Sequence, residues 1–334
     1  MSTQDDLQPY KNSIIKEMFL HTADENYITA RWCWRNRLMT DFFWNSVHAL
    51  EKYMKAVLLY NGRPVHKFSH NLAELYDAVS EIAGPLLPAQ LTQPQGYSGY
   101  WVEFTPREFL EKLDQNGNAD NRYLTYGYAQ HAFYLPMVDT MVWQVRRLII
   151  PLDQPVVHSR DGSAKPSNRE ILERQPDYAF NLMEALEKTM AADGSEAQHA
   201  LLNGNLAFAP PNYPHEPFFE GMSARNPVLL RRVLDPLGST REENARHGYR
   251  MAEWLLANTR QSGPVKREIE GAMQSALAAH PGMAASLGAI GPAPQPPVGP
   301  NASQPSRTAP SRKLGLLPLL LGAVALPILI FGRR

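Results

Sequence analysis

The sequence predicts an all-α protein, and three observations support that fold class. Apolar residues recur at steps of three and four along several stretches, which is the pattern of a helix with one buried face. A Ser/Thr-x-x-Glu pattern, typical of the first residues of a helix, occurs repeatedly between residues 22 and 242. No stretch shows several alternating segments separated by hairpin turns, as a β protein requires.

Four positions carry the helix-start pattern. In each of them a Ser or Thr stands three residues before a Glu, so that its hydroxyl and the carboxylate can bond the free N–H groups of a first turn. These positions are Thr22, Thr105, Ser167 and Ser239. At the second, Pro106 occupies the first helical position that proline favours. We therefore expect helices to begin at these four points.

Apolar faces at helical spacing lie between the expected helix starts and ends. They cover residues 43–58, 72–82, 137–149 and 180–190. Gly62 ends the first helix, Gly84-Pro85 ends the second, and Pro136 begins the third. The pattern resumes at residues 228–234 and 245–256.

Two stretches rich in Pro, Asn and Gly interrupt this pattern, at residues 151–168 and 203–226. We interpret them as long irregular loops within one helical domain over residues 10–265. The alternative is a division of this region into two domains.

The composition excludes some classes of protein. A hydrophobic fraction of 44% excludes wholesale disorder, and 33 basic against 33 acidic residues argue against a surface that coats nucleic acid. A local basic groove remains compatible with this balance. The single cysteine, Cys33, leaves no intramolecular disulfide and no cysteine-based zinc site, which fits a reducing compartment.

The C-terminal segment differs from the rest of the chain. Residues 314–332 contain no charged or polar side chain, and at ~1.5 Å per residue they span roughly 28 Å as a helix, enough for a hydrocarbon core. Basic residues flank the segment on both sides, at Arg312, Lys313, Arg333 and Arg334. We predict one C-terminal transmembrane helix that contacts membrane lipid. The alternatives are a buried core helix and a C-terminal sorting signal.

Residues 266–313 precede this tail and are rich in Pro, Gly and Ala, with few large apolar residues. They predict a flexible, disordered linker. The N-terminus carries no secretory signal pattern, so we place the helical domain in the cytoplasm, with the tail as a single-pass anchor. The basic residues on the two sides of the tail nearly balance, so charge alone does not orient it.

A longer motif lies in the helix at residues 42–62 and just after it. The helix carries Ala-x-Glu-Lys-x-x-Lys-Ala, and a short loop leads to His-Asn-Leu-x-x-Leu. The residues are Ala49, Glu51, Lys52, Lys55, Ala56, His70, Asn71, Leu72 and Leu75. With this motif residues 20–83 resemble the HEPN family, which usually has Asp at the position of Asn71. Asn can cap a helix equally well.

The resemblance implies an antiparallel helical bundle that forms a homodimer and has a role in nucleotide or RNA biology. It also implies a prokaryotic defence or toxin–antitoxin setting, a nucleotidyltransferase-type partner protein, and the bacterial inner membrane as the location of the anchor. In the family, the groove beside this motif binds a nucleotide or phosphate. The corresponding candidates are Glu51, Lys52, Lys55, Arg63 and His70. Alternatively, Glu51 and Lys55 form an ordinary i, i+4 ion pair worth ~0.3–0.5 kcal/mol.

Many HEPN proteins are metal-independent ribonucleases with an Arg, four to six residues, and a His. Arg241 and His247 have this spacing on an expected late helix, and Arg63 and His70 have it in a loop. In such a site the Arg stabilises the phosphorane charge and the His transfers the 2′-OH proton. The alternative is that these residues are solvated helix ends.

Two further patterns have a structural and a functional interpretation. An aromatic cluster spans residues 27–44, and a Tyr-rich segment spans residues 123–128. Both favour core packing, with Arg31, Arg35 and Arg37 facing solvent, over a stacking platform for single-stranded nucleic acid. His66 and His70 lack a third ligand nearby, so we predict neither a metal nor a cofactor.

Taken together, the sequence favours a membrane-tethered, HEPN-like module that binds nucleotide or RNA, or a protein partner. One alternative is an endoribonuclease that uses Arg241 and His247. The other is a non-catalytic membrane scaffold.

Overall fold

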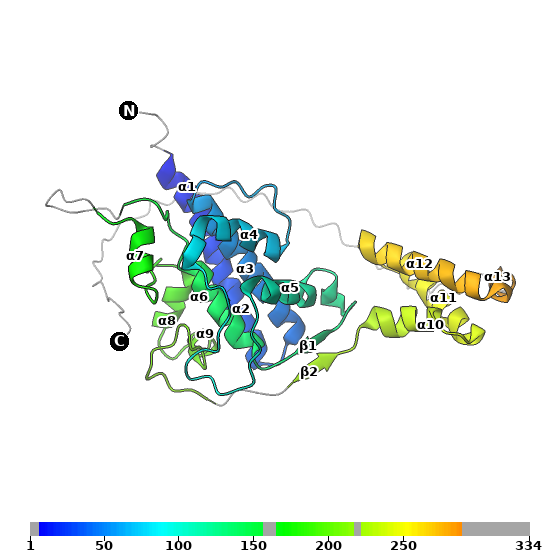
Figure 1. Ribbon diagram of the computed structural model, residues 1–334. Helices are drawn as coiled ribbons and strands as arrows, with labels where there is room; N and C mark the ends of the chain where they lie inside the picture. The colour runs from blue at the N-terminus through cyan, green and yellow to red at the C-terminus, as the bar shows by residue number, and fades with distance from the viewer. Residues whose placement is uncertain (1–6, 156–164, 217–221, 289–334) are drawn as a thin grey trace, which may run out of the picture. The chain divides into compact units, whose positions relative to one another are not determined.

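The computed structural model describes residues 7–155, 165–216 and 222–288, and helices dominate these residues (Figure 1). The predicted all-α class is confirmed for this part of the chain. Within the same ranges, no helix is both long enough and apolar enough to cross a bilayer. The predicted tail at residues 314–332 and most of the predicted linker lie outside the described residues.

The central helix is α3 (Met39–Tyr60), which follows α2 (Thr22–Arg35) after a short turn. It contacts α2, α4 (Leu72–Ala83), α5 (Pro106–Gly117) and α6 (Tyr134–Arg146). Its predicted apolar face is buried in full, at Phe43, Val47, Leu50, Met54, Val57 and Leu58. Burial of one large aliphatic or aromatic side chain contributes about 1.5–3 kcal/mol, so this face is a main source of stability.

The N-terminal part of the chain is more helical than the sequence predicted. A continuous helical run leads from α1 (Gln8–Ile15) through the π-helical segment η1 (Lys16–His21) into α2. The predicted helix start at Thr22 is therefore wrong, and its hydroxyl donates to the Met18 carbonyl at 2.7 Å. The run extends because Ile15 and Leu20 are buried in the core that surrounds α3.

Other predicted caps are confirmed. Thr105 begins α5 and Ser167 begins α7 (Asn168–Arg174), each with a reciprocal bond from the Glu three residues on. Asn71 begins α4, where its side chain accepts from the Glu74 N–H at 3.2 Å. Gly62 follows α3 with φ of +73°, a conformation that glycine adopts without a Cβ penalty.

Two predicted helix starts differ from the structure. α11 (Glu242–Asn258) has Arg241 at its N-cap, and Ser239 lies before it, where its hydroxyl accepts from the Arg241 N–H. The helix expected at residues 180–190 is reduced to α8 (Ala185–Ala191), because Met183 has φ of +57° and is exposed. Glu184 caps α8 together with Glu187.

The remaining elements up to residue 225 are short. They are the 3₁₀ turns η2 (Gly84–Leu86) and η3 (Asn121–Tyr123), the helix α9 (Glu196–Leu202), and the strands β1 (Tyr128–Gln130) and β2 (Ser223–Arg225). The two strands pair antiparallel, with Ala129 opposite Ala224. This ladder was not predicted, because three residues are too few for an alternating pattern to stand out.

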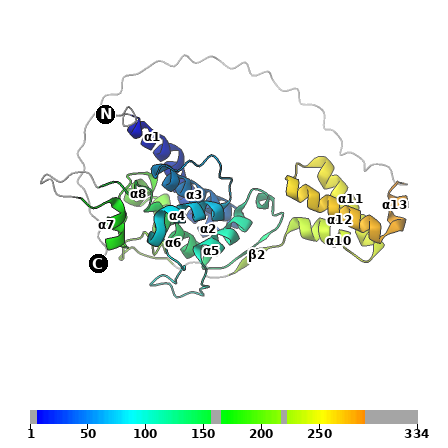
Figure 2. The ribbon, with the colours of Figure 1, turned by 45° about the horizontal axis from the view of Figure 1, so that its top comes forward.

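After β2 the chain forms η4 (Leu230–Leu234), α10 (Asp235–Leu237), α11 and α12 (Gly263–Ala279), and α11 lies beside α12 (Figure 2). The linker predicted from residue 266 is therefore helical at its start. Val265 and Ile269 are buried on one face of α12, which accounts for this difference. The chain divides into two compact units at residues 279 and 280, and α13 (Pro281–Gly288) belongs to the second unit.

Candidate functional site

One face of α3 carries polar and aromatic side chains instead of apolar ones. Trp44, His48, Glu51 and Lys55 follow one another at steps of four, three and four residues. His70 approaches this face from the loop before α4, and Asp114 on α5 interacts electrostatically with its groups. We call His48, Glu51, Lys55, His70 and Asp114 the Glu51 cluster.

Glu51 is the centre of this cluster and is only 4% exposed. The Lys55 Nζ donates to its Oε1 at 2.6 Å, and the His70 Nδ1 lies 3.0 Å from both carboxylate oxygens. The His48 Nδ1 is 3.6 Å from Oε2. Burial alone raises the pKa of this carboxyl, but hydrogen bonds from His48, Lys55 and His70 outweigh burial and lower the pKa to about 2. Glu51 is therefore ionised at neutral pH.

His70 is held on one side and open on the other. An ionised carboxylate only accepts hydrogen bonds, so the bond to Glu51 places a proton on the His70 Nδ1. The side chain is nevertheless 82% exposed. Its Nε2 is therefore oriented by a buried anion, and an incoming ligand can reach it as a hydrogen-bond or proton-transfer partner.

Asp114 gives the cluster a second carboxyl with the opposite tendency. Burial and the nearby charge of Glu51 raise its pKa to about 6, although His70 lowers it in part. Two neighbouring carboxyls with pKa values pushed apart are typical of sites that handle protons or charged ligands. Close to neutral pH, a change of about one pH unit thus alters the charge of the cluster.

Aromatic rings and a guanidinium extend the cluster along α3. The Arg122 guanidinium lies 4.2 Å above the centre of the Trp44 ring, and Trp44 meets the His48 ring edge-on at 4.0 Å. The His48 and His70 ring centres are 6.5 Å apart. Tyr123, which is 77% exposed, stands beside Arg122. We call Tyr123, Arg122, Trp44, His48 and His70 the ring row.

The structure separates the five predicted ligand-binding residues. Lys55 and His70 both contact Glu51. Lys52 points to α2, where its Nζ donates to the Asn26 side chain at 2.7 Å. Arg63 forms an exposed ion pair with Glu81 at 2.7 Å. Arg63 and His70 therefore contact different partners, although their spacing in the sequence fits the ribonuclease pattern.

Arg241 and His247 lie at the beginning of α11, and both are exposed. Among the residues that the structure describes, neither side chain takes part in a hydrogen bond or an ion pair. The ribonuclease alternative therefore rests on the spacing of the two residues alone. In the described ranges no group of three or more His, Cys, Asp or Glu could hold a metal ion.

Sequence reasoning missed three members of the site, His48, Asp114 and Arg122, and it interpreted Trp44 as core packing within the aromatic cluster. Trp44 and His48 share a helical face with Glu51, so their spacing was a usable indication. Asp114 and Arg122 come from α5 and η3, and no local pattern connects them with α3. The aromatic cluster was predicted correctly for Tyr27, Trp34, Phe42 and Phe43, which are buried in the core.

The chain matches no protein-family model, no curated protein and no solved structure. The resemblance to the HEPN family therefore stays a prediction.

Proposed function

We propose that this protein is a membrane-tethered nucleotide- or RNA-binding module and that its ligand lies along the ring row. One observation carries this proposal. A guanidinium, an indole and two imidazoles follow one another over one helix face, and they end at an ammonium–carboxylate pair. The HEPN-like bundle, the homodimer and the nucleotidyltransferase-type partner belong to the same proposal.

The chemistry of the row suits a short single-stranded ligand. Nucleic-acid bases stack on aromatic rings and on the planar guanidinium of Arg, and such stacking contributes about 1–3 kcal/mol per base. The exposed Tyr123 ring and the outer face of Arg122 offer these planes. The Lys55 ammonium can donate to a phosphate, and the His70 Nε2 can accept from a ribose hydroxyl.

The charge of the row also limits the ligand. Glu51 is ionised and offsets Lys55, so the positive charge here is small and local. A long nucleic-acid duplex gains affinity from many phosphate contacts, which this surface does not supply. A mononucleotide or a few nucleotides of single-stranded RNA fit better, in agreement with the zero net charge of the chain.

Fluorescence anisotropy with a labelled short single-stranded RNA tests the proposal on the full chain in neutral lipid nanodiscs. The double variant Arg122→Ala/Tyr123→Ala should weaken binding about tenfold or more, because it removes two stacking planes. Tyr100→Ala and Arg174→Ala are the matched controls, since both residues are exposed outside the row. Equal affinity of the double variant and the controls would refute the ring row as the binding surface.

The membrane tether is supported by the uninterrupted apolar stretch at residues 314–332 and its basic flanks. Cell fractionation tests it independently of the ligand. The full chain should sediment with membranes, and a chain that ends at residue 313 should remain in the supernatant. Recovery of the full chain in the supernatant would contradict the tether.

A further inference from the structure

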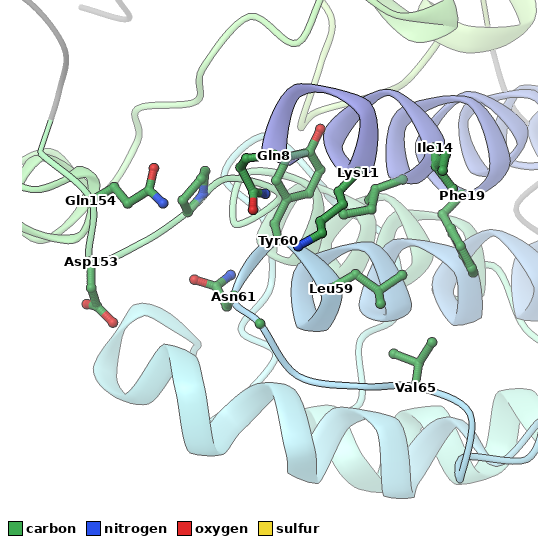
Figure 3. A pocket seen from close by; sticks show the side chains of 13 residues that line it. Gln8, Lys11, Ile14, Phe19, Leu59, Tyr60, Asn61, Val65, Asp153 and Gln154 are labelled. Carbon is green, nitrogen blue, oxygen red and sulfur yellow. The ribbon is translucent and has the colours of Figure 1, made fainter. Parts of the chain in front are cut away.

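A cleft of about 730 Å³ lies away from the ring row, between the α1–η1 run, the C-terminal end of α3 and the loop at residues 151–154 (Figure 3). Its volume is within the range of about 300–1,000 Å³ that small-molecule sites occupy. None of its lining residues belongs to the Glu51 cluster or to the ring row. Binding of a ligand in this cleft is therefore independent of the proposed function.

The two ends of the cleft differ in chemistry. Ile14, Phe19, Leu59 and Val65 line one end with aliphatic and aromatic groups (Figure 3). Gln8, Lys11, Tyr60 and Gln154 line the other end with amides, an ammonium and a phenol. An elongated ligand with one apolar and one polar end matches this division.

The charge that is free at the polar end is positive. Among the described residues, the Lys11 ammonium has no carboxylate or hydrogen-bond partner. The Asp153 carboxylate also lines this end, but Arg169 donates to it at 2.6 Å. The Asn61 side chain is fully used, because it bonds the backbone of Val57, Ile150 and Leu152.

Tyr60 is a second donor that lines the cleft. Its hydroxyl makes only a long bond of 3.5 Å to the Asn12 carbonyl. Burial, together with the charge of Glu184, raises its pKa, so the phenol keeps its proton near neutral pH. An ammonium and a protonated phenol in the same cleft are both donors, and an ammonium favours an anionic head group through a charge-assisted bond.

We propose that this cleft binds a single-chain amphiphile with an anionic head, of the fatty-carboxylate class. The carboxylate contacts the Lys11 ammonium and the Tyr60 hydroxyl. The hydrocarbon chain extends along Ile14, Phe19 and Leu59, where it is removed from water. Charge complementarity at Lys11 selects the anionic head, and the apolar end selects the chain.

The experiment is photolabelling of the full chain in neutral phosphatidylcholine nanodiscs with a diazirine derivative of dodecanoate, followed by peptide mass spectrometry. Labels are expected in peptides from residues 8–19 and 59–65. Excess dodecanoate should abolish this labelling, and dodecanol, which lacks the charge, should compete at least about tenfold less well. Labelling confined to residues 314–332, or equal competition by dodecanol, would overturn the proposal.

Two variants test the polar end and the apolar end of the cleft separately. Lys11→Gln should weaken labelling about tenfold by loss of the charge-assisted bond, and Ile14→Asn should weaken it by loss of apolar contact. Lys188→Gln, on α8 outside the cleft, is the control and should label normally. Normal labelling of Lys11→Gln would refute the head-group assignment. Competition by phosphatidylglycerol vesicles but not by dodecanoate would indicate a bilayer surface at the cleft and would refute a single-chain ligand.

Discussion

Two groups of charged residues both pair carboxylates with basic side chains, but they differ in their exposure to solvent. The first, the buried network, joins Asp24 to Arg146 and Arg31 to Asp139, and all four residues are buried. The second is the Glu51 cluster, in which a buried anion also binds basic side chains. In the buried network the charged groups are directed at protein partners, whereas the cluster leaves His70 open to solvent.

The bonds of the buried network show what a structural role requires. Arg146 donates to both oxygens of Asp24 and to both oxygens of Glu187. Arg31 donates to Asp139 and to the backbone carbonyls of Ala200 and Asn203. These bonds connect α2 and α6 with the α8–α9 region. Complete pairing leaves no group for a ligand, so the network fixes helices, whereas the open cluster can bind.

The largest expected effect comes from Arg146→Met. The variant leaves the Asp24 carboxylate buried without its ion partner, which costs about 3–5 kcal/mol in the free energy of unfolding. Urea denaturation followed by tryptophan fluorescence measures it. Arg63→Met is the matched control, because Arg63 and Glu81 form a similar pair with 53% and 67% exposure and should contribute less than about 1 kcal/mol. A similar loss of stability in both variants would contradict the expectation that the buried ion pair contributes more than the exposed one.

An intermediate effect is expected for Glu51→Gln. The pKa of Glu51 in the folded protein is about 2, below its ordinary value of 4.5, so its ionised form contributes stability above about pH 4.5. This contribution is lost as the pH falls from 4.5 toward 2. The variant should therefore lose about 2–3 kcal/mol at pH 7 and distinctly less at pH 3. A loss that does not depend on pH would show that the ionised carboxylate is not the stabilising species.

The smallest effect, of opposite sign, is expected for Asp114→Asn. The folded pKa of about 6 is above the ordinary value of 3.8, so stability is fully present below pH 3.8 and declines as the pH rises through 6. Removal of the charge should therefore stabilise the protein at pH 7 by about 1–2 kcal/mol and have little effect at pH 3.5. Denaturation midpoints at the two pH values measure the difference. A destabilised variant at pH 7 would contradict the unfavourable burial of the ionised Asp114 carboxylate beside Glu51.

Features that depend only on neighbours along the chain could be predicted without the structure. The buried face of α3, the caps at Asn71, Thr105 and Ser167, and the turn at Gly62 follow from local spacing and backbone preference, and all were predicted. Glu51, Lys55 and His70 were also named together, since their motif is nearly contiguous.

Which polar groups meet across helices depends on how the helices pack, and the sequence did not predict it. Arg31 was predicted to face solvent but is 1% exposed, because its partner Asp139 lies on a helix more than a hundred residues away. Asp114 and Arg122 belong to the site for the same reason. Lys52 lies outside it, because its ammonium donates to Asn26 on α2. Helical periodicity gives the direction of a side chain around its own axis. Whether that direction ends in water, at a counter-ion or in a site depends on the packing of the other helices.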